Sequence, residues 1–265
     1  MSGPLRPSPA PGAVAALARV EGHKLLVHPY FLAGIAFVGI GSAIFLRATL
    51  TQPLVSWDDD GWTVAVGFWM LAMMTMVGAN HAALRDRREH TEEQHTSLPA
   101  GPATKIGGLL TATLWPAAVT GVLIAAIAGF ASTRGMSLSA VQVVHLAELT
   151  GIVVLLGAFG VAVAVWLPNP FVVPLVAIAM FVVHPGEQSR AWHAITPFAD
   201  MVTVELAVWH LAYVVGLAAL FGVGAIARST RTRPVLIAGV IVAGIVGVAA
   251  AVLLARACPG ACLIG

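Results

Sequence analysis

The chain has 265 residues, of which 58% are hydrophobic and only 10% are charged, and its formal net charge at pH 7 is +2. An ordinary soluble domain is roughly one quarter charged residues, and no water-soluble fold buries this much apolar side chain, because surface area shrinks too slowly with size. The composition therefore excludes a soluble globular protein and predicts an all-α integral membrane protein, since a spanning helix satisfies its own backbone within the bilayer.

Long uncharged runs, read in chain order, predict the membrane-spanning helices. Residues 1–12 are rich in proline, so we expect a disordered tail there and not the apolar core of a cleavable signal. Seven long apolar runs with few charges follow, and we prefer seven spans to six. The predicted spans are Tyr30–Leu46, Trp62–Leu84, Ile106–Ala131, Val141–Leu167, Phe171–His184, Val204–Ala227 and Val235–Ala255. The stretch from Pro185 to Thr203 either lies flat on the membrane or dips back into it.

The distribution of Lys and Arg predicts the orientation of these spans. If the helices alternate, one side receives ten cations, namely Arg6, Arg19, Lys24, Arg85, Arg87, Arg88, Lys105, Arg228, Arg231 and Arg233. The other side receives four cations, Arg47, Arg134, Arg190 and Arg256. Because cations concentrate in cytoplasmic loops, the sequence predicts a multi-pass plasma-membrane protein with its N-terminus in the cytoplasm and its C-terminus outside.

Ionisable groups inside the spans are candidates for function, because an unpaired charge in lipid is costly. Glu148 is the carboxylate well inside a span, and His145 lies three residues before it on the same helical face. The two form either a translocation site or a structural polar pair. His81, His184 and His210 could ligate haem, although no facing pair is evident. We find no paired carboxylates, metal-ligand cluster or nucleophile with its base, so we expect no catalytic residue and no metal site.

Two patterns concern helix packing. Pro168, Asn169 and Pro170 predict a tight turn, which would make the fourth and fifth spans adjacent partners in a hairpin. Small residues recur at four-residue spacing in the third and seventh spans, which favours close packing within the chain or across a dimer. These stripes are Gly121, Ala125 and Gly129, and Gly239, Ala243 and Gly247.

The only two cysteines, Cys258 and Cys262, follow the last predicted span. This position is on the oxidising side of the membrane in the predicted orientation. A disulfide between them and two free thiols remain as alternatives.

One loop between the second and third spans carries most of the polar sequence. It runs from Arg85 to Lys105 and reads RDRREHTEEQHTSLPAGPATK. Residues 85–96 contain no Gly or Pro and alternate in charge, so they predict a short exposed helix that begins at Arg85 and ends before Pro99. The loop is either a solvated connection or a docking surface for a partner.

The segment leading into the first span, residues 18–31, reads ARVEGHKLLVHPYF. With Arg, Glu and Lys followed by Leu-Leu and a Pro, it resembles the interfacial elbow helix of the ABC-2-type transporter permeases. The loop after the second span resembles the coupling segment of that family, and residues 196–233 resemble its closing part. The resemblance assigns the elbow to Arg19, Glu21 and Lys24, and the coupling to Arg85, Arg87, Arg88, Glu89, Thr91, Glu92, Glu93 and Pro99.

The resemblance implies the membrane subunit of an ATP-driven exporter of a hydrophobic or amphipathic substrate, such as a drug, a peptide or a lipid. It divides the chain into an elbow helix at 13–29, a transmembrane domain at 30–233 with its coupling segment at 85–105, and an additional helix with an outer tail at 234–265. The chain contains no phosphate-binding loop, so ATP and Mg²⁺ would sit on a separate cassette subunit and this chain would hold no cofactor. The resemblance also implies two further partners, a second copy of the permease and membrane lipid. It does not imply a nucleic acid partner.

The sequence also departs from that family. His90 stands where the family has Gly, Gln94 and His95 stand where it has Leu-Leu, and a seventh span exceeds its usual six. The alternatives are an intramembrane enzyme, a haem-binding membrane protein, and a secondary transporter, for which no inverted repeat is visible.

Overall fold

The computed structural model describes residues 12–51, 57–89, 101–183, 203–230 and 233–257, and these residues form helices and no strand. The helices are α1 (Ala13–Leu26), α2 (Pro29–Thr51), α3 (Trp57–Arg88), α5 (Pro102–Ala112), α6 (Leu114–Thr133), α7 (Ala140–Trp166), α8 (Val172–Val183), α9 (Val204–Thr230) and α10 (Arg233–Ala257).

Among the described residues, five stretches are long and apolar enough to cross a membrane. They are Pro29–Thr51, Thr63–Arg88, Pro102–Thr133, Ala140–Trp166 and Val204–Thr230. The chain is therefore a multi-pass helical membrane protein, as its composition predicts. α8 has only 12 residues, and the apolar part of α10 that the structure describes is the shorter stretch Ile237–Ala250. The predicted spans in these two helices stay predictions.

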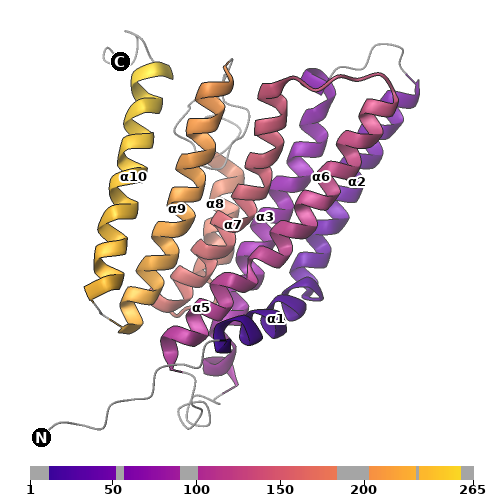
Figure 1. The fold of residues 1–265 in the computed structure, drawn as a ribbon. Coiled ribbons are helices and arrows are strands. Elements are labelled where there is room, and N and C mark those ends of the chain that lie inside the picture. The colour runs from indigo at the N-terminus through magenta and orange to yellow at the C-terminus, as the bar shows by residue number, and fades with distance from the viewer. Residues whose placement is uncertain (1–11, 52–56, 90–100, 184–202, 231–232, 258–265) are drawn as a thin grey trace, which may run out of the picture.

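Helix α1 lies across one end of the bundle, here called the α1 end, while the other helices run along its length (Figure 1). It occupies most of the segment predicted as an elbow, and it stops at Leu26, shortly before Pro29, where a helix ordinarily ends. α2 leaves the α1 end and reaches the opposite end, called the far end, from which α3 returns (Figure 1). α10 also runs from the α1 end to the far end.

The third predicted span is not one continuous helix. It divides at Thr113 into α5 and α6, and Pro116 is the third residue of α6. Pro lacks a backbone N–H and its ring clashes with the carbonyl four residues earlier, here that of Ala112, so the helical ladder cannot pass through this turn. The Thr113 hydroxyl donates to the carbonyl of Leu110, 2.7 Å away. The break brings Trp115 so close to α1 that a Cβ on Gly22 would overlap its indole ring.

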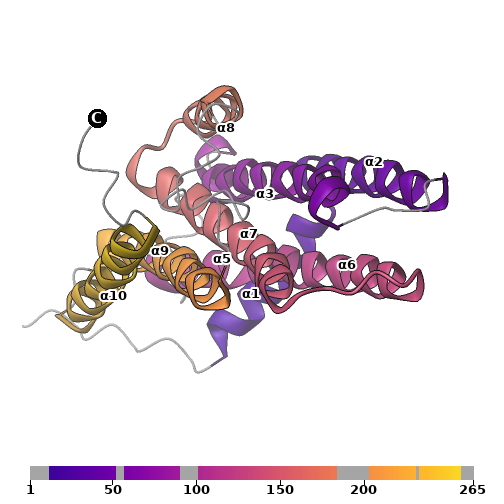
Figure 2. The ribbon, with the colours of Figure 1, turned by 90° about the horizontal axis from the view of Figure 1, so that it is seen from above.

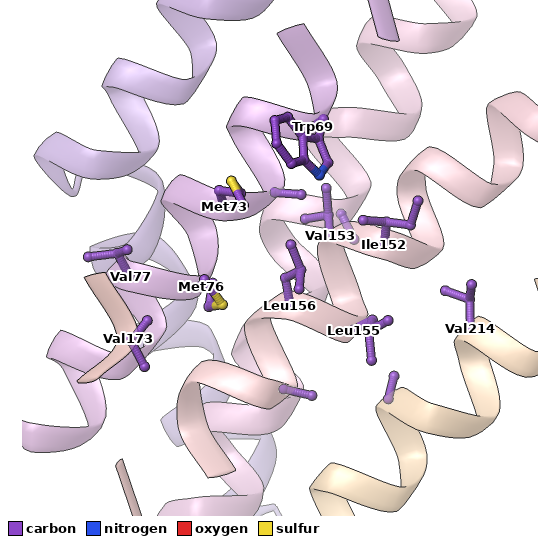
Figure 3. Close-up of a cluster of buried hydrophobic side chains, with 14 of the residues drawn as sticks. Trp69, Met73, Met76, Val77, Ile152, Val153, Leu155, Leu156, Val173 and Val214 are labelled. Carbon is purple, nitrogen blue, oxygen red and sulfur yellow. The ribbon is translucent and has the colours of Figure 1, made fainter. Parts of the chain in front are cut away.

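The core is centred on α3 and α7, with α8 and α9 against its sides (Figure 3). α3 contributes Trp69 and Met76, and α7 contributes Ile152 and Leu156. α7 begins at a capping box in which the side chains of Ser139 and Gln142 each accept from the other's backbone N–H.

The backbones of α3 and α7 meet at Gly160. A Cβ there would lie well within the van der Waals contact distance of the Met76 carbonyl oxygen, and Asn80 Nδ2 donates to the Gly160 carbonyl at 3.1 Å. Gly41 approaches the carbonyl of Thr63 in the same way where α2 packs on α3. Small residues thus permit the close contacts, but not at the positions expected from the sequence.

In the stripes of the third and seventh predicted spans, only the first glycine of each meets another part of the described chain. The nearest atoms belong to Thr150 for Gly121 and to Val223 for Gly239. Gly129 and Gly247 have nothing within 4 Å beyond their own helices. Close packing along the full stripes within the chain is therefore wrong for the described residues, because these faces of α6 and α10 turn outward. Packing of the stripes across a dimer stays a prediction.

The turn after α7 is tight, as predicted. The Asn169 side-chain oxygen accepts from the backbone N–H of Phe171 at 2.9 Å, a local bond that favours turns. α8 does not return along α7, however. It packs chiefly on α3, with Val173 buried beside Met76 and Val77 (Figures 2 and 3). The two helices are therefore not closely packed hairpin partners.

Candidate functional site

A buried carboxylate joins α1 to the end of α3. The inward face of α1 consists of Ala18, Glu21, Gly22 and Leu25, which lie on one side at helical spacing. Arg85 reaches Glu21 with both terminal nitrogens, at 2.8 Å to Oε1 and 3.2 Å to Oε2. Lys24 adds a third contact, 3.2 Å from Oε1. The Glu21 side chain is 5% exposed and that of Arg85 is 31% exposed, so this forked pair is largely shielded from water.

Two opposing influences act on the pKa of Glu21. Burial is the largest single influence and raises it, while the hydrogen bonds and positive charges of Arg85 and Lys24 lower it. The attractive contacts together outweigh burial and hold the pKa of Glu21 below its ordinary value. Glu21 is therefore ionised at neutral pH, and the bridge is a true ion pair.

A second ion pair lies next to the first. Asp86 is buried at the end of α3 and contacts the ammonium of Lys105 in the first turns of α5. These residues stand at the two ends of the segment that resembles a coupling element. The segment 85–105 is thus anchored at its start to α1 through Glu21, and its two ends are tied to each other.

The expectation of a separate helix beginning at Arg85 is wrong. Arg85, Arg87 and Arg88 form the last turn of α3, which ends at Arg88. Nothing between Leu84 and Arg88 breaks a helix, and arginine has a high helix propensity, so the spanning helix continues to the charged residues. Residues 90–100 lie outside the described residues, and with them Thr91, Glu92, Glu93 and Pro99.

The charged residues from Arg85 to Glu89, at the end of α3, fall into two groups. Arg85 and Asp86 point inward to their partners, whereas Arg87, Arg88 and Glu89 are exposed. On α1, Arg19 is exposed and Glu21 is buried. The sequence analysis singled out both Glu21 and Arg85 but did not predict an ion pair between them. The available signal was the position of Glu21 among the apolar residues of α1, where a carboxylate requires a cation.

A second buried polar pair lies inside the bundle. Nδ1 of His210 on α9 is 3.2 Å from Oε1 of Glu148 on α7, and both side chains are fully buried. Sequence reasoning linked Glu148 to His145, which is also buried on α7, and treated His210 only as a possible haem ligand. The structure thus adds a contact of Glu148 with α9, and the pairing of Glu148 with His145 stays a prediction.

The histidines considered for haem do not face each other in the described structure. His81 lies at the α1 end, where its ring packs against that of Tyr30 at 5.1 Å, while His210 contacts Glu148. His184 lies outside the described residues. The described residues contain no group of three His, Cys, Asp or Glu side chains that could hold a metal ion. Cys258 and Cys262 also lie outside the described residues.

Comparison with known proteins gives no match to this chain among protein-family models, curated proteins or solved structures.

Proposed function

We propose that this chain is the membrane subunit of an ATP-driven exporter, and that a separate ATPase docks on the segment following α3. The observation that carries the proposal is the Glu21–Arg85 bridge, with the Asp86–Lys105 pair beside it. Together they connect the segment to α1, α3 and α5. A partner that grips the segment would therefore move three helices at once.

The charges suit this mechanism. Glu21 and Arg85 satisfy each other within the chain, so they position the segment and do not contact the ATPase. Arg87 and Glu89 are exposed at the end of the same helix, where they can form charge-assisted contacts with a partner. Rigid-body motion of packed helices is an established way to turn a local event into a global change.

The cation-rich α1 end would face the cytoplasm, where ATP is available, and the chain would reside in the plasma membrane. Outward-facing apolar side chains such as Phe37, Ile40 and Ile44 follow α2, a face suited to lipid or to a second copy of this chain. With few charges along the spans, a hydrophobic or amphipathic substrate fits better than an ion or a sugar. This chain itself would hold no nucleotide, and ATP and Mg²⁺ would belong to the ATPase.

The experiment that tests docking uses a double variant, Glu89→Ala with Glu93→Ala, in the tagged full chain. Glu89 is exposed, so we expect the variant to reach the membrane at the wild-type level with an unchanged Tm. Truncating one side of a buried interfacial charge pair typically costs about 2–5 kcal/mol. Far less ATP-hydrolysing activity should therefore co-purify with the variant than with the wild type.

The matched control is Glu205→Ala, which removes an exposed carboxylate from the far end of the bundle. It should retain the associated ATPase activity. Equal retention by the double variant and by the control would contradict docking on this segment and would favour a solvated loop.

A further inference from the structure

A pocket of about 340 Å³ opens at the α1 end, where the end of α1 and the turn that leads to α2 meet the last turns of α3. Its polar lining consists of Lys24, His28, His81, Arg85, Arg88 and Glu89. Three of these are permanent cations and two are imidazoles, so the pocket suits an anion.

The charges around the pocket do not cancel among the described residues. Lys24, Arg85 and Arg88 contribute three positive charges, and the carboxylates Glu21 and Glu89 contribute two negative ones. Glu21 is already bound by Arg85 and Lys24. The contact that the structure gives for Arg88 is with an imidazole, since its Nη1 lies 3.4 Å from Nδ1 of His81. One positive charge remains, and Arg88 presents it on a fork of N–H donors that matches phosphate geometry.

The two imidazoles are held in place by a tyrosine ring. The rings of His28 and His81 each lie against Tyr30, with centroids 5.3 Å and 5.1 Å away. Burial lowers the pKa of His28 below its ordinary value, so its ring is neutral at pH 7. A neutral imidazole adds a hydrogen bond to a bound anion and no second charge.

The surroundings of the pocket favour a lipid over a soluble anion. The helix ends that line the pocket lie at the α1 end of the bundle (Figure 1). The ends of spanning helices are at the depth of the phospholipid headgroups. Val27 and Leu32, on either side of His28 in the chain, are more than half exposed, so exposed apolar side chains are available near His28 for the acyl chains of a lipid. Basic pockets between spanning helices on the cytoplasmic side bind anionic headgroups.

We propose that this pocket binds the phosphodiester of an anionic phospholipid, with Arg88 and Lys24 holding the phosphate oxygens. A phosphodiester carries one negative charge, which equals the positive charge left over by the described residues. The proposal does not depend on the exporter function, because it concerns the isolated chain and its lipid.

The test is a titration of the purified full chain in a neutral detergent, with Tm read from the fluorescence of its seven tryptophans. The probes are short-chain phosphatidylglycerol, short-chain phosphatidylcholine and inorganic phosphate. A ligand that binds the folded state raises Tm with its concentration. We expect a saturable rise with phosphatidylglycerol, none with phosphatidylcholine, and little with inorganic phosphate. An equal rise with inorganic phosphate would assign the pocket to soluble phosphate and overturn the lipid proposal.

Two variants locate the site. Arg88→Ala removes an exposed side chain, so its Tm without lipid should match that of the wild type, while its apparent affinity for phosphatidylglycerol should fall about tenfold or more, as expected for a charged hydrogen bond. Arg19→Ala removes the same charge from an exposed position on α1 outside the pocket and should keep the wild-type affinity. An equal loss in both variants would mean general attraction of anionic lipid and would overturn the proposal.

Discussion

Arg85 directs both terminal nitrogens at Glu21, a residue 64 positions earlier in the chain. The cation at the end of a spanning helix is thus satisfied by a helix that lies across the bundle. Because Glu21 is almost fully buried, losing its charge leaves Arg85 and Lys24 facing each other without a carboxylate between them.

The first prediction concerns this bridge. Glu21→Gln should lower the free energy of unfolding by about 1–3 kcal/mol at pH 7, less than for a fully buried pair because Arg85 is partly exposed. Thermal unfolding in detergent measures it. Lys24→Gln is the control and should cost less, because the Lys24 side chain is half exposed.

The same bridge predicts a pH dependence. The pKa of Glu21 is lower in the folded protein than its ordinary value of 4.5, so its stabilising contribution is complete above that value and is lost as the pH falls through the folded pKa. The stability difference between wild type and Glu21→Gln should therefore be constant near neutral pH and shrink in acid below 4.5. A difference that grows on acidification would contradict the assignment.

The second prediction concerns the close contact of α3 and α7. Gly160→Ala places a Cβ against the Met76 carbonyl oxygen, and overpacking of this kind typically costs about 1–3 kcal/mol. Gly129→Ala is the matched control, because nothing lies within 4 Å of its added Cβ, and it should be as stable as the wild type or up to about 1 kcal/mol more stable, because Ala favours a helix over Gly. Both are compared by thermal unfolding. Equal effects would show that α3 and α7 do not meet at Gly160.

The third prediction concerns the pair inside the bundle. A double-mutant cycle of Glu148→Ala and His210→Ala should give an interaction energy of about 0.5–3 kcal/mol, as for residues in direct contact. The parallel cycle of Glu148→Ala with His81→Ala should be additive, since His81 lies at the α1 end. Additivity in both cycles would contradict a direct contact between Glu148 on α7 and His210 on α9.

The fourth prediction concerns orientation. After Cys258 and Cys262 are replaced by Ser, a single cysteine is placed at the exposed far-end position Thr133→Cys or at the exposed α1-end position His23→Cys. The first should react with a membrane-impermeant maleimide added to intact cells, and the second only after the cells are opened. The reverse pattern would place the α1 end outside and exclude docking of a cytoplasmic ATPase.

The helices were largely predictable because hydropathy is a property of neighbouring residues. The predicted span Tyr30–Leu46 lies within α2. The predicted span Val141–Leu167 matches α7 to within one residue at each end. Pro116 indicates a break in the helix near Thr113. The sequence analysis did not predict this break, because the residues on both sides of Pro116 are apolar and form one continuous hydrophobic run. Hydropathy marks where a helix lies in the membrane and not where its backbone ladder breaks.

The contacts of the site were less predictable, because they join residues far apart in the chain. Glu148 has His145 at helical spacing on its own helix, and no local pattern indicates that His210 on α9 also reaches it. The inward turn of Arg85 depends likewise on how α1 crosses the bundle. The small-residue stripes show the same limit, since spacing identifies a face of a helix but not what it meets.

The central claim, that this chain works with an ATPase, is tested most directly by measuring ATP hydrolysis by the tagged chain purified from its native membrane, with and without a panel of amphipathic compounds. The account predicts that hydrolysis co-purifies with the wild type and that at least one compound stimulates it. Arg85→Gln should keep the bound ATPase, but the increase in ATP hydrolysis caused by the compound should be at least about fivefold smaller than in the wild type. A factor of this size corresponds to a typical coupling free energy. A folded, purified chain without associated ATP hydrolysis would contradict the account.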